Sequence, residues 1–213
     1  MEWITVPEKG FTLREVRTLT NRNVNLSEEL EKSVSAILEK VRDGGDAAIR
    51  ELTKKFDGVE LSDFRVTEEE MQEALAQVTP EFLEVLKEAK ANIETFHKEQ
   101  VRKSWTKNFR DGVELGEQFL PIQRVGVYVP GGRAAYPSTV LMDTVPALVA
   151  GCPSVAMTTP PGKDGKVNPN ILAAAYVAGV KEIYKVGGAQ GIAMLAYGTE
   201  SVEPVFKIVG PGN

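Results

Sequence analysis

A glycine loop lies between a buried-strand pattern and a helix start in "RVGVYVPGGRAAYPSTVLM", residues 124–142. This order of strand, loop and helix is the usual anion site of nucleotide-binding folds, because the free N–H groups of the first helical turn point at the ligand. The spacing matches neither G-x-G-x-x-G nor G-x-x-x-x-G-K-[ST], the standard phosphate-binding patterns. Pro130-Gly131-Gly132 is therefore either a ligand cradle or only a bend, and the local sequence leaves both open.

Tyr128 stands two residues before this loop, at the end of the predicted strand. In parallel sheets, ligands bind beyond the carboxyl ends of the strands. Tyr128 is therefore a candidate ligand contact, although a packed strand residue explains it equally well.

Three other reactive groups are explained by structure alone. The one histidine, His97 in "ETFHKEQ", has no second ligand or orienting partner nearby in the sequence, which indicates a half-exposed residue near a core edge. Cys152 in "VAGCPSV" has no basic neighbour in the sequence to activate it, so we expect a packed thiol. The run "TEEE", residues 67–70, is typical of a charged first helical turn rather than a metal site.

Composition bounds the class of protein. The chain has 213 residues, 42% hydrophobic and 26% charged, which is ordinary for a soluble globular protein of one large or two small domains. No apolar run is long enough to span a bilayer, and "MEWITVPEKG" lacks the basic start of a signal peptide, so we expect a cytoplasmic protein. One cysteine agrees with a reducing compartment. A net charge of −5 gives no reason to expect nucleic acid or an acidic membrane as partner.

The first half of the chain is predicted to be helical. Ser27 can cap a helix that ends at Gly44-Gly45, and Asp46 begins a second one. The apolar faces are predicted to carry Leu30, Val34, Ile37, Leu38 and Val41 in the first helix, and Ile49, Leu52 and Phe56 in the second.

Two further helices and a hairpin are expected next. Thr67 and Glu70 form a capping box for a helix that buries Met71, Ala74, Leu75 and Val78. Thr79-Pro80 opens a longer helix, to about Val101, with Phe82, Leu86, Ala89, Ile93 and Phe96 facing inward. Asp111-Gly112 suits a tight turn, so residues 104–120 are predicted to form a hairpin.

From residue 121 onward, short apolar β-rich runs alternate with helical segments. This alternation predicts βαβ units and a parallel sheet covered on both faces, a Rossmann-like α/β architecture. We expect two domains, an N-terminal helical region with the hairpin at 1–120 and a Rossmann-like domain at 121–213. The loops "PGGRAAYPS", "TPPGKDGKVNPN", "GGAQG" and "GPGN" should gather at the carboxyl edge of the sheet.

Several motifs in order, "GVYVPGG", "STVLM", "PALVAGC", "VGGAQGIAMLAYGTESV" and "KIVGPGN", resemble those of the histidinol dehydrogenase family. Weaker similarities, "VRDGGDAAIRELTKKFDGV" and "NIETFHKEQ", extend the resemblance over nearly the whole chain. The resemblance implies a fold of the aldehyde dehydrogenase-like superfamily and a homodimer. It also implies a zinc-dependent enzyme of histidine biosynthesis that oxidises L-histidinol to L-histidine through the aldehyde and reduces two NAD⁺.

By the same resemblance, Tyr128, Gln190 and Asn213 are the residues that contact NAD. The zinc ligands, the acid/base pair and the substrate-binding serine of the family fall beyond "GPGN", so no residue here is assigned to zinc, catalysis or histidinol. We therefore expect the chain to correspond to about half of such an enzyme and to be inactive alone. Two alternatives stay open: another aldehyde dehydrogenase-like oxidoreductase, and a non-catalytic nucleotide-binding or dimerisation module.

Overall fold

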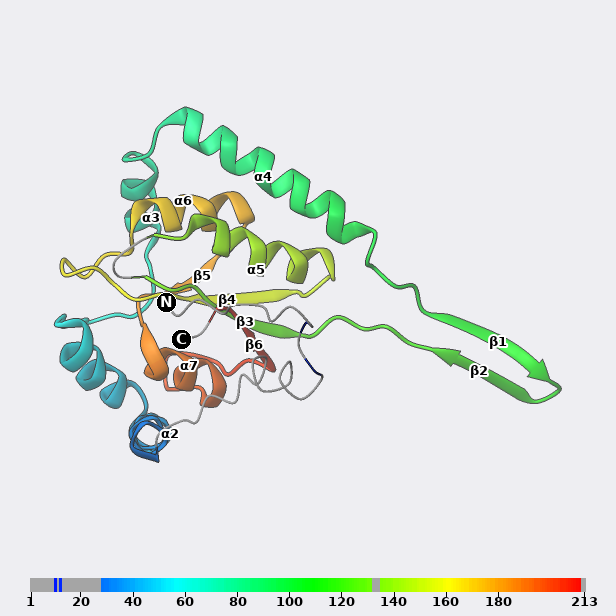
Figure 1. The fold of residues 1–213 in the computed structure, drawn as a ribbon, viewed down its shortest axis with the longest axis horizontal. Coiled ribbons are helices and arrows are strands. Elements are labelled where there is room, and N and C mark those ends of the chain that lie inside the picture. The colour runs from blue at the N-terminus through cyan, green and yellow to red at the C-terminus, as the bar shows by residue number, and fades with distance from the viewer. Residues whose placement is uncertain (1–9, 11, 13–27, 132–134, 212–213) are drawn as a thin grey trace. The chain divides into compact units, whose positions relative to one another are not determined.

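The computed structural model describes residues 10, 12, 28–131 and 135–211. The chain forms two compact units, Met1–Val34 and Ser35–Asn213. In the first unit, the described part consists mainly of the start of helix α2 (Glu28–Asp57). Ser27, the predicted cap of this helix, lies outside the described residues. All other elements belong to the second unit (Figure 1).

A glycine breaks α2 where the sequence predicts two helices. Gly45 has φ 50° and ψ −136°, which is far from helical geometry. Beyond the break, the backbone N–H of Asp46 donates to Glu200 Oε2 at 2.8 Å, so a distant carboxylate caps the second half. The predicted stop at Gly44-Gly45 and restart at Asp46 are confirmed.

The predicted apolar face of α2 is buried in its middle but not at either end. Leu30 and Val34, predicted on this face, are 49% and 36% exposed, so the expectation is wrong for these two residues. Val41, Ile49 and Leu52 are buried, and Ile37 and Leu38 are partly buried beside them. Phe56 was expected to face inward, and this is wrong: it is 51% exposed, with Lys55 over its ring. The helical period continues to Phe56, but the ring lies on the exposed side of the last turn.

The next two helices begin as predicted. In α3 (Glu68–Leu75), Thr67 and Glu70 form the full capping box, and Met71 and Ala74 are buried. In α4 (Pro80–Lys98), Thr79 Oγ1 accepts the N–H of Phe82 at 3.2 Å. Leu86 is buried in α4, whereas Phe96, expected inward, is 65% exposed, so that expectation is also wrong. The end of α4 reaches past the helices that it covers (Figure 1).

The predicted hairpin is present. Strands β1 (Trp105–Arg110) and β2 (Val113–Glu117) pair in antiparallel fashion, with Gly112 at φ 74° in the turn. The hairpin projects from the rest of its unit, and nearly all its residues are exposed (Figure 1). Trp105, Phe109 and Leu115 are among its exposed apolar side chains.

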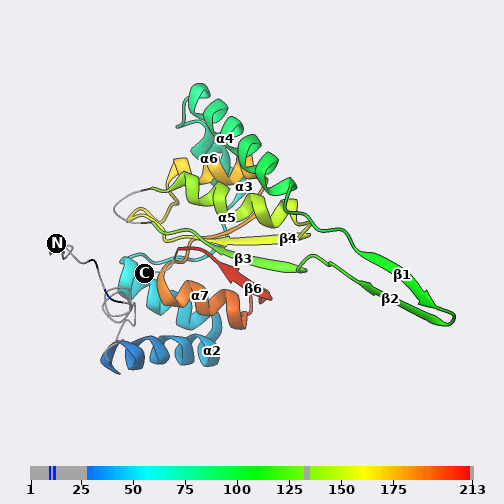
Figure 2. The ribbon, with the colours of Figure 1, turned by 45° about the vertical axis from the view of Figure 1, so that its right-hand side comes forward.

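The second half forms the predicted parallel sheet, in the order β5-β4-β3-β6. The strands are β3 (Arg124–Tyr128), β4 (Ser154–Thr158), β5 (Glu182–Tyr184) and β6 (Lys207–Val209). The connecting helices are α5 (Pro137–Val149), α6 (Pro169–Ala178) and α7 (Gly188–Tyr197). Figure 2 shows α5 and α6 on one face of the sheet and α7 on the other.

Two hydrophobic clusters cover the two faces of the sheet. One joins β3 and β4 to α3, α4, α5 and α6, around residues such as Val127, Leu141 and Leu172. The other joins the second half of α2 to α7 and the sheet, around Ile49, Ala156 and Met194. The α/β fold with a parallel sheet between helices is therefore confirmed. The predicted domain boundary near residue 120 remains a proposal.

Candidate functional site

The strand order reverses between β3 and β6. From β3 the chain moves outward through β4 to β5, and α7 then returns it to the far side of β3. In open parallel sheets, ligands bind outside the carboxyl ends of the strands at such a reversal. The last residue of β3 is Tyr128, and β6 is followed by Gly210. A Cβ on Gly210 would collide with the backbone of Tyr128, so the two strand ends are in direct contact.

Tyr128 connects the carboxyl end of β3 to the start of α7 through a hydrogen bond. Its side chain is half-buried, and its hydroxyl accepts a hydrogen bond from the backbone N–H of Gly188 at 3.3 Å. Gly188 is exposed and opens the first turn of α7. The N-cap residue, Gly187, makes no side-chain cap, so apart from the bond between Gly188 and Tyr128 the first-turn N–H groups keep a positive partial charge for a ligand.

Gln190 lies on the same turn, beneath the surface. The side chain is 2% exposed, and its Oε1 would be 2.7 Å from a Cβ placed on Gly188. The side chains of Tyr128 and Gln190 therefore both lie next to Gly188, although the two residues are 62 positions apart in the sequence. Asn213, the third predicted contact, lies outside the described residues.

Glycines allow the carboxyl-edge loops to pack closely. A Cβ on Gly131, after β3, would be 2.6 Å from Pro160 Cγ, and a Cβ on Gly187, after β5, would be 2.5 Å from Pro160 Cβ. Pro160 itself follows β4. The loops after β3 and β5 thus both pack against Pro160, in the loop after β4. At Gly131, glycine is therefore required for close packing of the loops. Gly132 lies outside the described residues.

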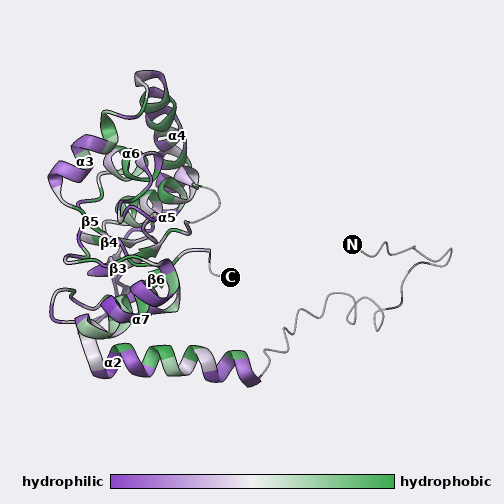
Figure 3. Cartoon of the chain, turned by 90° about the vertical axis from the view of Figure 1, so that its left-hand side faces the viewer, coloured by the Kyte–Doolittle hydropathy of each residue, from purple (hydrophilic) through white to green (hydrophobic). Residues whose placement is uncertain are grey.

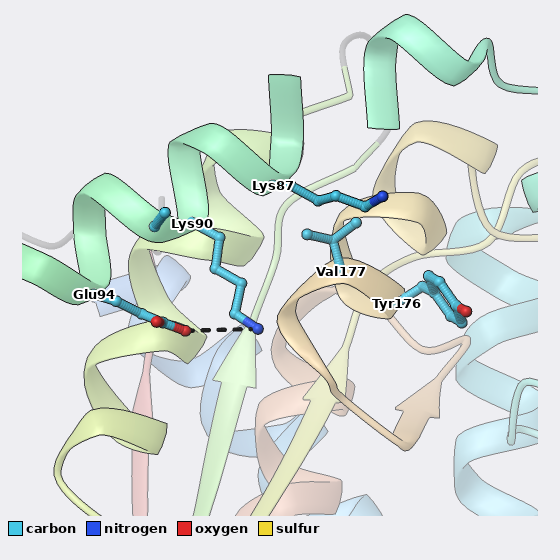
Figure 4. A pocket seen from close by; sticks show the side chains of 6 residues that line it. Lys87, Lys90, Glu94, Tyr176 and Val177 are labelled. Atoms are coloured by element: carbon cyan, nitrogen blue, oxygen red, sulfur yellow. Dashed lines mark ion pairs between the residues drawn. The ribbon is translucent and has the colours of Figure 1, made fainter. Parts of the chain in front are cut away.

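A cavity of about 250 Å³ opens beside these loops. Gly131, Thr159, Pro160, Asp164 and Asn168 are among its lining residues. A larger hollow of about 450 Å³ lies elsewhere, between α4 and α6 (Figure 4). Its lining includes Tyr176 and the ion pair Lys90–Glu94 on helix surfaces, away from the carboxyl edge of the sheet.

The opposite edge of the sheet is held by a charge network. Arg124, at the start of β3, binds Glu182 of β5 through two nitrogens at 2.5 and 2.8 Å, and binds Ser154 Oγ of β4 at 2.7 Å. The hydrogen bond from Arg124 lowers the pKa of Glu182, although burial opposes it. Burial and a hydrogen bond to Glu182 raise the pKa of Tyr184. The network ties three parallel strands together at their amino ends and lies away from the strand reversal.

A histidinol dehydrogenase family profile matches residues 20–213. The chain belongs to the histidinol dehydrogenase family. Its relatives include histidinol dehydrogenase of Geobacillus kaustophilus, 54% identical over 88% of this chain and 44% of the relative. The enzyme of Methanosarcina barkeri is 52% identical over 93% of this chain and 46% of the relative. The chain thus spans about half the length of the curated relatives that it matches.

A solved structure agrees with the fold. The crystal structure of histidinol dehydrogenase from Elizabethkingia anophelis matches with a TM-score of 0.87 and 39% identity, over 95% of this chain and 47% of that chain. The α/β arrangement described above is therefore that of the histidinol dehydrogenase family.

The remaining reactive residues of this family member have the structural roles expected from the sequence. His97 is half-buried at the end of α4, and its Nδ1 lies 2.7 Å from Gln100 Oε1. Cys152 is buried as a free thiol. The acids of "TEEE" form the first turn of α3. Among the described residues, no group of three or more His, Cys, Asp and Glu side chains converges as a metal site.

Sequence reasoning missed one feature of that turn. Glu70 binds not only the backbone of Thr67 but also Lys185 Nζ, at 2.7 Å. Lys185 lies 115 positions further along the chain, and the only local signal was a lysine directly after a predicted strand. Among the described residues, no helix has the length and apolar character that a membrane span requires.

Proposed function

We propose that this chain is the NAD-binding half of a histidinol dehydrogenase. In the complete enzyme, L-histidinol would be oxidised to L-histidine through the aldehyde, with two NAD⁺ reduced. The observation that carries the proposal is the meeting of Tyr128 and Gln190 on Gly188, at the reversal of strand order, in a chain of this family. We also propose that the fold belongs to the aldehyde dehydrogenase-like superfamily and that the protein is cytoplasmic.

The residues at this edge suit a dinucleotide. The first turn of α7 offers N–H donors to a pyrophosphate beyond the Gly188 N–H that Tyr128 accepts, and exposed Gly188 lets a ligand approach the backbone. Tyr128 offers an aromatic face and orients Gly188 through its hydroxyl. Gln190, with Asn213, would add amide groups, and the burial of Gln190 limits its contact to the edge of the amide. When bound, NAD supplies the hydride acceptor.

Zinc does not fit the described part of this chain. A zinc site needs three or four converging ligands, and the described residues form no such group. We therefore assign to these residues no step that involves zinc, and no proton transfer to or from histidinol. We propose that the 213 residues alone do not oxidise histidinol.

We further propose that the complete enzyme is a homodimer. The exposed hairpin supports an interface, since a two-stranded ribbon is marginally stable in water and Trp105, Phe109 and Leu115 are uncovered.

Titration calorimetry and an NADH assay on the pure chain test these proposals. We expect NAD to bind and no NADH to form from histidinol, with or without zinc. Absence of NAD binding would contradict the NAD-binding role. NADH formation above a heat-killed control would contradict the proposed inactivity.

An NADH assay with simple aldehydes as substrates separates the two alternatives. A binding or dimerisation module gives no turnover with any substrate. An aldehyde dehydrogenase-like oxidoreductase needs a reactive cysteine and oxidises simple aldehydes, for which buried Cys152 is poorly placed.

A further inference from the structure

Lys185 is a buried cation at the carboxyl edge of the sheet. It directly follows β5, is 6% exposed, and its Nζ lies 2.7 Å from Glu70 Oε1. The other oxygen of the same carboxylate, Oε2, accepts the backbone N–H of Thr67 at 2.9 Å. One side chain thus caps α3 and neutralises the lysine. Because an unpaired buried charge is strongly unfavourable, Glu70 and Lys185 hold α3 and the β5–α7 loop together.

A second ion pair repeats the arrangement one turn later. Glu73 of α3 pairs with Lys166, which lies in the β4–α6 loop. Met71 and Ala74 bury the adjacent face of the same helix. In Figure 3, most of α3 has the colour of hydrophilic residues. We call the two pairs, Glu70–Lys185 and Glu73–Lys166, the α3 clasp. It fixes two separate carboxyl-edge loops to one short helix.

Backbone hydrogen bonds anchor the clasp to the sheet. The N–H of Lys185 donates to Phe64 O at 2.7 Å, and the N–H of Val66 donates to Ile183 O at 2.8 Å. The segment before α3 therefore runs along the open edge of β5. From the inner side, Thr158 Oγ1 donates to Val186 O at 2.5 Å. The start of the β5–α7 loop is held from both sides.

We propose that the α3 clasp is a positioning element for the candidate site, an inference that rests on the proposed binding of NAD. Lys185 precedes Gly188 by three positions and Gln190 by five. The backbone between them is short and close-packed, since a Cβ on Gly187 would strike Pro160. The position of Lys185 therefore sets where Gly188 meets Tyr128. Glu70 and Lys185 act through this loop and do not touch the cofactor.

Glu70→Gln is the sharpest test, because glutamine also serves at this position of a capping box while the charge opposite Lys185 is lost. We expect faster amide hydrogen exchange in residues 185–191 and NAD binding that is roughly three- to tenfold weaker, measured well below the unfolding temperature. Glu73→Gln should have a smaller effect, because its pair with Lys166 is half-exposed. Glu88→Gln makes the same charge change at an exposed α4 site and should change neither quantity.

A neutral double variant distinguishes loss of the ion pair from misfolding caused by an unpaired buried charge. Glu70→Gln with Lys185→Met leaves no unpaired buried charge, so it should fold and still show faster loop exchange and weaker NAD binding. As single variants, Lys185→Arg keeps the charge opposite Glu70 and should bind NAD more tightly than Lys185→Met, which removes it. If the wild-type chain does not bind NAD, the proposed function fails, and this inference fails with it. If the wild type binds but the double variant binds equally well, whether or not exchange is faster, the inference alone is overturned.

Discussion

The hydroxyl of Tyr128 and the backbone nitrogen of Gly188 lie 3.3 Å apart and form a hydrogen bond between the end of β3 and the start of α7. The two residues lie 60 positions apart in the sequence, one in a strand and the other in a helix. This bond spans the strand reversal at which a dinucleotide is proposed to bind.

Tyr128→Phe should weaken NAD binding by up to about tenfold, since a hydrogen bond of this kind contributes about 0.5–1.5 kcal/mol. The ring remains, so the free energy of unfolding should fall by no more than about the same amount. Titration calorimetry and urea unfolding measure the two effects. Tyr176→Phe, in the hollow between α4 and α6, is the control and should leave NAD affinity unchanged (Figure 4). Equal affinity in both variants would argue against a role for Tyr128.

Gln190→Ala should weaken both NAD binding and folding. An exposed glutamine could be truncated with little effect on stability, but Gln190 is 2% exposed, so alanine leaves a gap beneath Gly188. We expect a loss of about 1–2 kcal/mol in the free energy of unfolding. The NAD affinity should be measured at a temperature where the variant is fully folded. A variant of wild-type stability would show that the side chain is not packed as described.

Gly187→Ala should destabilise the protein because its Cβ would lie 2.5 Å from Pro160 Cβ. We expect a cost of about 2–3 kcal/mol, which is typical of overpacking, with loss of NAD binding as the loops separate. Gly179→Ala separates this steric effect from backbone strain. Gly179 has φ 90° and no neighbour within 4 Å of an added Cβ, so only about 1 kcal/mol is expected. Thermal unfolding of both variants gives the comparison, and equal costs would rule out the clash.

Loss of the Arg124–Glu182 pair should appear as a change in acid stability. The pKa of Glu182 is lowered in the folded state, chiefly by its hydrogen bond to Arg124. Its stabilising contribution is therefore present above the unfolded-state pKa, about 4.3, and is lost as pH falls through the lower folded-state value. Glu182→Gln should cost roughly 2–3 kcal/mol at neutral pH and flatten the loss of stability below about pH 4.

Urea unfolding from neutral pH to about pH 3 measures this profile. Glu114→Gln, on the exposed hairpin, is the control and should change stability by less than about 0.5 kcal/mol. An acid profile of Glu182→Gln that parallels the wild type would contradict the assignment.

Local signals in the sequence predicted most of the elements. The Thr67–Glu70 box and Thr79-Pro80 mark two helix starts by hydrogen bonds between neighbouring residues. Asp111-Gly112 marks a turn because Gly112 adopts a positive φ. Phe56 and Phe96 show the limit of periodicity. Both residues fall on the apolar side of their helix, as the period predicts, yet both are exposed. Whether such a side chain is buried depends on how far the neighbouring element extends.

The site was predicted less completely. The convergence of Tyr128 with the "GGAQ" loop follows from parallel-sheet topology, which the alternation of strands and helices reveals. The burial of Gln190 and the Glu70–Lys185 pair depend on side-chain packing between segments far apart in the chain. No local pattern encodes these distances.

The pairing of β3 with β6 has a consequence for biosynthesis. Val125 of β3 lies opposite Lys207, so about 80 residues must leave the ribosome after β3 before its second edge can be covered. In the nascent chain, β3 can pair with β4 early, while Val125 and Val127 border an open strand edge. Such an edge can pair with another chain. Until β6 emerges, β3 therefore keeps an unpaired edge, which a chaperone bound to the nascent chain would protect.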